Sequence, residues 1–191
     1  MRSLGRLLAL GVALGMVGAA LAHLPAILQT EYELERPEIS WALYGDMPEG
    51  SEVYTLRLTY EEGFALPMEL LIPHRRSLGD FRPAYAVVGP GLPAPTAGEL
   101  ALLPRAPPAG AGVFLELDDD GERLVIFESF MRRMFWSTGP MALALEAGDF
   151  EIWIWSPDGI PGEFVFGMGV EEDFSGGGWG KVFDDWSTYN Y

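Results

Sequence analysis

The chain of 191 residues contains no cysteine and only two histidines, His23 and His74. Without cysteine the fold can hold no disulfide, no thiolate metal site and no cysteine nucleophile. Eleven phenylalanines, seven tyrosines and six tryptophans provide large apolar surfaces for a core. The sequence therefore predicts a fold that is stabilised by hydrophobic burial alone.

Basic residues are also scarce, with 12 against 28 acidic ones and a formal charge of -16 at pH 7. Such a polyanionic surface repels nucleic acid and anionic lipid head groups, so we expect neither as a partner. It can attract cations or a basic partner, although a well-solvated exported surface is the simpler explanation. Membrane contact is expected only if the N-terminal segment is retained as an anchor.

The first 22 residues have the three parts of a secretory signal peptide. Arg2 and Arg6 form a basic start, residues 7–18 are uncharged and apolar, and Ala20-Leu21-Ala22 is a small-x-small cleavage pattern. The apolar run is shorter than the ~20 residues of a membrane span, and an uncleaved anchor is the alternative. The sequence thus predicts an exported protein, periplasmic, cell-surface or secreted. Cleavage would leave residues 23–191, enough for one domain, with 28 acidic and 10 basic residues and a charge of -18.

No long stretch after residue 22 repeats apolar residues at the helical period of 3.6. Short alternating or aromatic-rich runs appear instead, such as residues 53–60, and glycine and proline end them. This pattern predicts an all-β, antiparallel β-sandwich of eight or nine strands over residues 40–174, after a signal helix. Residues 23–39 are expected to form an N-terminal arm, and residues 175–191 a glycine-rich aromatic tail.

Two connections carry their own signals. Residues 113–117 and 123–127 flank Asp118-Asp119-Asp120-Gly121, which predicts a β-hairpin because Asp-Gly tolerates the positive φ angles of a tight turn. Residues 91–112 are rich in proline, alanine and glycine. We expect this stretch to be a long loop that crosses from one sheet to the other.

Seven short stretches stand in a fixed order between residues 40 and 174. They are SWALYG (40–45), LLIP (70–73), FRP (81–83), VGPGL (88–92), FESF (127–130), GEFVFGMG (162–169) and EDF (172–174). In this order they resemble a family of exported domains of uncharacterised function, itself similar to the bacterial pre-peptidase C-terminal (PPC-like) domain. The resemblance implies a jelly-roll-like sandwich that serves as an accessory, binding or surface module, and it transfers no active site.

Three tryptophans are candidate ligand-binding residues. Trp136, Trp153 and Trp155 could stack against sugar rings, and the last two share one face of their strand because they lie two residues apart. The opposite face of the strand is apolar as well. Residues 150–155 therefore form either a central strand buried on both faces, which is the commoner outcome, or a strand with an exposed aromatic patch.

Candidate metal ligands come from two places. Asp118 and Asp120 concentrate the oxygen ligands that Ca²⁺ prefers, but without the spacing of an EF-hand, so a solvated turn explains them better. Cleavage after Ala22 would make His23 the N-terminus, where its α-amino group and ring could chelate Cu²⁺ with His74 as a further ligand. The simpler alternative is that His23 is exposed and binds nothing.

Catalytic signatures are weak. The chain has no Gly-x-Ser-x-Gly motif. A Ser-His-Asp triad would depend on His74, which we expect instead to be a surface-loop residue. With 28 acidic residues, a close carboxylate pair is expected by chance. We therefore expect a non-catalytic envelope module that binds protein or glycan or adds structure. A copper-binding protein or copper-dependent oxidative enzyme is the alternative, and a hydrolase comes third.

The copper alternative predicts that correctly processed protein binds Cu²⁺ through His23, with an affinity above that of the same chain with an acetylated N-terminus. Titration followed by electron paramagnetic resonance measures both affinities. Equal affinities would contradict this alternative, because the free α-amino group is one of the proposed ligands.

Overall fold

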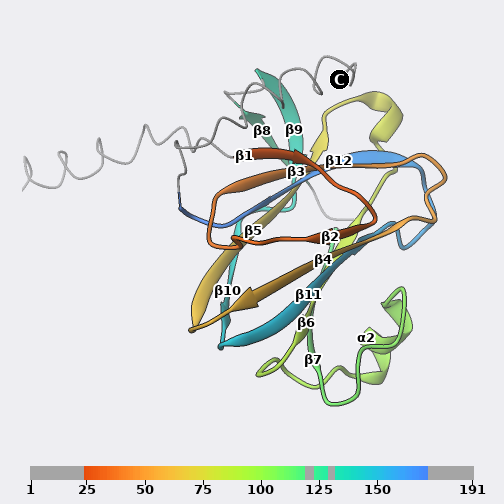
Figure 1. The fold of residues 1–191 in the computed structure, drawn as a ribbon. Coiled ribbons are helices and arrows are strands. Elements are labelled where there is room, and N and C mark those ends of the chain that lie inside the picture. The colour runs from red at the N-terminus through yellow and green to blue at the C-terminus, as the bar shows by residue number, and fades with distance from the viewer. Residues whose placement is uncertain (1–23, 119–122, 129–131, 172–191) are drawn as a thin grey trace, which may run out of the picture.

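Two β-sheets lie face to face and form a sandwich (Figure 1). The computed structural model describes residues 24–118, 123–128 and 132–171. The larger sheet contains β1 (Leu24–Ile27), β3 (Trp41–Met47), β12 (Gly162–Met168), β5 (Phe64–Pro73), β9 (Arg133–Ser137) and β8 (Leu124–Glu128) in that order, with β10 (Met141–Leu145) also paired to β5. The smaller sheet contains β2 (Glu31–Glu33), β4 (Val53–Tyr60), β11 (Gly148–Trp155), β6 (Ala84–Gly89) and β7 (Gly112–Leu117). The predicted β-sandwich is thereby confirmed.

Each sheet is mixed, whereas the sequence predicted purely antiparallel pairing. β1 runs parallel to β3, and β2 runs parallel to β4, while the other paired strands are antiparallel. Both parallel strands come from residues 23–39, which were expected to form an arm. Leu28 and Leu34, which follow β1 and β2, are buried in the main core, and this burial holds the segment in the sandwich.

The long loop at residues 91–112 is confirmed, but both predictions about which strands the two connections join were wrong. β7 and β8 belong to different sheets, so the chain around Asp118 crosses the sandwich and makes no hairpin. Residues 91–112 instead join β6 to β7, which are antiparallel neighbours in one sheet. This loop contains the short helix α2 (Ala97–Leu102), which begins at a capping box between Thr96 and Glu99. Turn residues indicate only the local backbone geometry. Packing of the strands decides which of them become neighbours.

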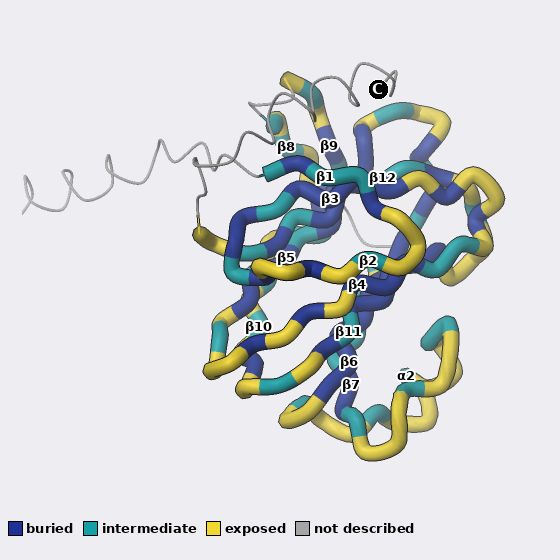
Figure 2. Tube along the Cα trace, in the orientation of Figure 1, coloured by how far each residue is buried: buried dark blue, intermediate teal, exposed yellow. Residues whose placement is uncertain are grey.

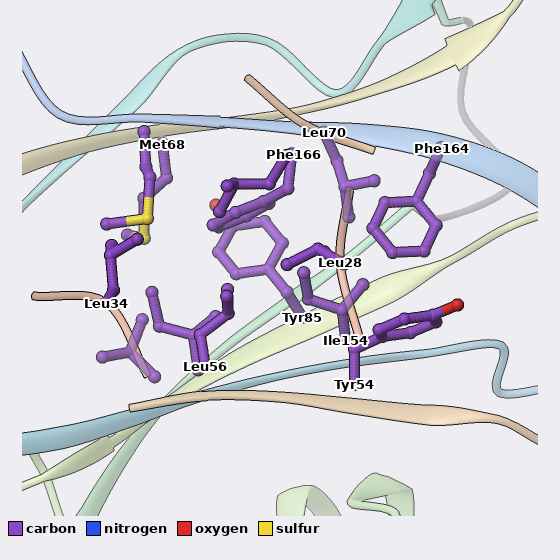
Figure 3. Close-up of a cluster of buried hydrophobic side chains, with 14 of the residues drawn as sticks. Leu28, Leu34, Tyr54, Leu56, Met68, Leu70, Tyr85, Ile154, Phe164 and Phe166 are labelled. Carbon is purple, nitrogen blue, oxygen red and sulfur yellow. The ribbon is translucent and has the colours of Figure 1, made fainter. Parts of the chain in front are cut away.

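The core lies between the sheets and is built from alternate residues of the central strands. In Figure 3, Phe164 and Phe166 project from the larger sheet toward the smaller one. Leu56 and Ile154 project back toward them from β4 and β11. All four side chains are almost completely buried, so this layer supplies the stabilisation that disulfides give to other exported domains.

The outward faces of both sheets carry buried side chains as well. On the smaller sheet Trp153 and Trp155 pack with Ala84, Ala86, Val88 and Val113. On the larger sheet Phe135 packs with Ala42, Tyr44, Leu71 and Val165. Figure 2 shows the result as dark blue along the central strands and yellow around α2. Within the described ranges, no helix is long and apolar enough to cross a membrane.

Close packing between β3 and β12 depends on Gly45. This residue lies opposite Phe164 in the sheet register, and the Phe164 ring also packs edge-on against Tyr54 of the other sheet, with 5.5 Å between ring centroids. A Cβ atom at position 45 would lie 2.2 Å from the ring of Phe164. The ring therefore occupies the space that any side chain at position 45 would need.

We expect Gly45→Ala to lower the free energy of unfolding by about 1–3 kcal/mol, the usual cost of overpacking a core. Urea unfolding followed by tryptophan fluorescence measures the change. Gly167→Ala is the matched control on β12, because its Cβ would come no closer than 3.7 Å to any of the surrounding atoms. Equal losses in the two variants would contradict this account of Gly45.

Candidate functional site

The three tryptophans that were candidate ligand-binding residues do not lie together. Trp153 and Trp155 are 1% and 4% exposed on the outward face of the smaller sheet, so neither ring offers a face to solvent. Trp136 lies on β9 in the larger sheet and is half-buried against the main core. β11 is thus a central strand buried on both faces, and the tryptophans form no common stacking platform.

Polar contacts fasten the β6–β7 loop over Trp153. The Arg105 guanidinium stands 4.4 Å from the centre of the Trp153 ring and donates to Thr55 at 3.1 Å. Glu151 accepts from Arg105 at 3.0 Å and from the Trp153 indole nitrogen at 2.7 Å. Each of these groups thereby has a partner within the fold, and together they keep the loop closed over the tryptophan.

A groove of about 560 Å³ lies beside this loop, between residues 108–111 and the outward side chains of β4 and β11. On its floor the Thr59 hydroxyl donates to Asp149 at 2.7 Å, and Arg57 pairs with Glu151 at 3.3 Å. The two carboxylates therefore interact with other residues and do not face each other across the groove. Such a floor can hold water or small polar groups, and its side chains already have hydrogen-bonding partners.

A raised carboxyl pKa is one sign of an acid catalyst, and Asp46 has one. Partial burial raises its pKa, and the charges of Glu163 and Glu52 raise it further. Asp46 lies on β3 in the larger sheet and does not line the groove. The raised pKa and the groove therefore do not combine into a catalytic site.

Asp118, a candidate calcium ligand, is held between two arginines. Arg82 contacts one of its carboxylate oxygens at 3.1 Å, and Arg123 contacts the other. The side chains of Asp118 and Arg123 are only 5% and 6% exposed. Two guanidinium charges at this distance disfavour a metal ion beside Asp118, whose carboxylate here serves as the anion of a structural ion pair. Asp120 lies outside the described residues.

Arg123 joins this ion pair to the aromatic side chains of the larger sheet. Its guanidinium also donates to the carbonyl of Phe81 and stands 5.3 Å from the centre of the Trp136 ring. The ring of His74 packs edge-on against the same tryptophan, with 4.6 Å between centroids. Because Asp118 follows β7 and Arg123 precedes β8, the cluster ties the two sheets together at this end of the sandwich.

The proposed copper ligands are not brought together in what the structure describes. His74 is exposed after β5, and His23 lies outside the described residues. Among the described residues there is no group of three or more histidine, aspartate or glutamate side chains that could hold a metal ion. Copper binding by His23 thus stays a prediction.

Four of the eight large apolar side chains that are exposed in the described ranges lie on β8 and β9. Leu124, Val125, Phe127 and Met134 are 55%, 44%, 61% and 43% exposed, and we call these four residues the β8 overhang. Val125 and Phe127 lie opposite Trp136 and Met134 in the register, so they share the face of the sheet that points toward the core. Both are exposed, and neither belongs to the core between the sheets.

In the described ranges no strand pairs with the outer edge of β8. The Met134 carbonyl accepts a hydrogen bond from the His74 amide at 3.0 Å, and the Thr138 amide donates to the Leu70 carbonyl at 3.1 Å, so Met134 of β9 and Thr138 directly after β9 face β5. The intervening residues of β9 face β8 and pair with Leu124, Ile126 and Glu128. Backbone direction alternates along a strand, and therefore the N–H and C=O groups of Val125 and Phe127 point away from the sheet.

Strands at the opposite edge of the sandwich carry features that discourage pairing. β1 contains Pro25, which has no N–H group to donate, and β2 is three residues long with exposed Glu31 and Glu33. β8 contains no proline or lysine and exposes large apolar side chains. Sequence reasoning missed this feature, because four consecutive apolar residues at 124–127 read equally well as a buried strand.

Comparison with known proteins gives no family assignment: no family model matches the chain, and no curated protein does. The two-sheet sandwich is the part of the resemblance to PPC-like domains that the structure supports.

Asp118→Asn is expected to lower the free energy of unfolding by about 3–5 kcal/mol, because it leaves the Arg123 charge buried without its anion. Adding Arg123→Met should recover part of this loss by removing the stranded charge. Urea unfolding measures both. Asp158→Asn, in an exposed turn, is the control. A loss no larger than that of the control would show that the buried ion pair contributes nothing.

Proposed function

We propose that this protein is an exported, non-catalytic module that binds another polypeptide by adding an extended strand of it to the edge of β8. The observation that carries the proposal is the edge position of β8 next to the β8 overhang: among the described residues no strand pairs with the outer backbone groups of β8, and its apolar side chains are exposed. Main-chain hydrogen bonds give such strand addition its affinity, and side chains on alternate positions give it specificity.

Exposed edges of this kind are a hazard in a protein without a partner. A flat apolar edge strand pairs readily with other chains and leads to aggregation. Burying a large apolar side chain such as Phe127 contributes about 1.5–3 kcal/mol, so a partner strand that covers it gains both burial and hydrogen bonds. The protection of β1 and β2 and its absence from β8 thus favour a specific role for β8.

Protein binding is preferred over glycan binding because of where the aromatic rings lie. Glycan platforms need open ring faces, whereas the Trp153 and Trp155 rings are buried, Trp153 beneath Arg105 of the β6–β7 loop. The non-catalytic part of the proposal is supported by the groove, in which Asp149 and Glu151 already have partners. Export, and with it a place at the cell envelope, rests on the N-terminal sequence.

Selection from a phage-displayed library of random peptides tests the proposal. We expect enriched peptides to alternate apolar and polar residues, as a strand half-covered by the overhang would. Phe127→Lys should abolish their binding, whereas Leu102→Lys, at an exposed leucine on α2, should leave it unchanged. The amides of a bound peptide fall into two alternating sets, and only one set has N–H groups that face β8. N-methylation of that set should remove binding, whereas N-methylation of the other set should not.

No enrichment over an immobilised control protein would contradict the proposal. So would peptides whose binding survives Phe127→Lys, since they would bind elsewhere on the molecule.

A further inference from the structure

We infer that the strand which β8 accepts is β8 of a second copy of this chain, antiparallel, with the two-fold axis at Ile126. This inference rests on the proposed function and names its partner. In such a pair the two larger sheets become one continuous sheet across the dimer.

The hydrogen-bonding groups of β8 fit this register. Val125 and Phe127 are the two residues of β8 whose backbone groups point outward. With the axis at Ile126, Val125 of each copy lies opposite Phe127 of the other. Val125 and Phe127 then form two hydrogen-bonded pairs across the interface, one on each side of the axis. Ile126 lies opposite Ile126 of the second copy in a non-hydrogen-bonded pair. No outward group of the strand is left without a partner.

The side chains fit the same register. Residues opposite each other in an antiparallel pair share a face, so Phe127 packs beside Val125 of the second copy, an aromatic and β-branched pair that sheets favour. Met134 of each copy lies next to this pair, because it is the neighbour of Phe127 on β9. The side chains of Val125, Phe127 and Met134 from the two copies thereby form one continuous apolar patch on one face of the joined sheet.

Neighbouring registers are less favourable. An axis at Val125 would place Phe127 opposite Arg123, whose guanidinium is held by Asp118 and the Phe81 carbonyl. With the axis at Phe127, Val125 would lie opposite no apolar residue of β8 in the second copy. The register with the axis at Ile126 therefore pairs the outward backbone groups and the apolar side chains of β8 best.

Charge also favours this approach of two copies. The chain is strongly acidic as a whole, yet residues 74–82 and 118–133 together contain six arginines and six acidic residues. The described arginines of these segments lie around β8, β9 and the connection after β5. Two acidic molecules repel each other least where their local charge is neutral. A second copy is thus better suited to this edge than to the glutamate-bearing edge of β2.

The absence of cysteine makes a sharp test possible, since a single introduced thiol is the only one in the chain. At Ile126 the Cα atoms of the two copies would lie about 4.5 Å apart, within the range of about 4.4–6.8 Å that a disulfide spans. Leu124 would lie opposite Glu128 of the second copy and roughly 13 Å along the strand from its own counterpart. Only the residue on the axis can therefore cross-link to itself.

The experiment oxidises Ile126→Cys, Leu124→Cys and Leu102→Cys in the full chain and follows covalent dimers by non-reducing electrophoresis. We expect Ile126→Cys to cross-link roughly tenfold faster than the other two, because pairing raises the local thiol concentration far above that in bulk solution. The double variant Leu124→Cys/Glu128→Cys should cross-link as Ile126→Cys does. Light scattering of the unmodified protein should give twice the mass of one chain, and Phe127→Lys should halve it.

Cross-linking of Ile126→Cys at the rate of Leu102→Cys would overturn the inference, as would a monomeric mass for the unmodified protein. Equally fast cross-linking of the Leu124→Cys variant would overturn the proposed register. A monomer that still selects strand-like peptides at β8 would leave the proposed function standing without this partner. A monomer that selects none would remove both.

Discussion

Burial of apolar side chains between two sheets of unequal size is the constraint on which the rest of this molecule depends. Phe164 and Phe166 can fill the space between the sheets only where strands of both sheets overlap. With no disulfide, this overlap must be broad enough to hold the domain together. Val125 and Phe127 lie on the same face of the larger sheet but outside this core, and in the described part of the chain both are exposed.

Polar contacts appear where the sheets must be joined. Asp118 and Arg123 are almost fully buried at the crossing from β7 to β8, and a buried ion pair of this kind specifies geometry more than it adds stability. Arg105 has a comparable position at the β6–β7 loop, where its guanidinium covers Trp153. Both arginines belong to a chain with few basic residues, and both hold connections in place. The scarce positive charges described here are thus used largely within the fold.

The sandwich itself was predictable because the alternation of side chains between the two faces of a strand is visible in the sequence. Ile152 and Ile154 alternate with Trp153 and Trp155, and a strand that is apolar on both faces belongs in the middle of a sheet, where β11 lies. The change of sheet after Asp118 was not predictable, because the same turn residues occur whether the next strand joins the same sheet or the other one. The overhang was hidden for a related reason. Whether an apolar strand lies at an edge depends on long-range topology, which no local pattern records.

The two edges of the larger sheet also have different relations to the chain that precedes Leu24. β1 begins there, and β8 lies at the other end of the path β1-β3-β12-β5-β9-β8, five strand spacings or roughly 24 Å away. If β8 binds a partner as proposed, that partner lies at the edge of the larger sheet farthest from β1, and the four strands between the two edges fix the separation.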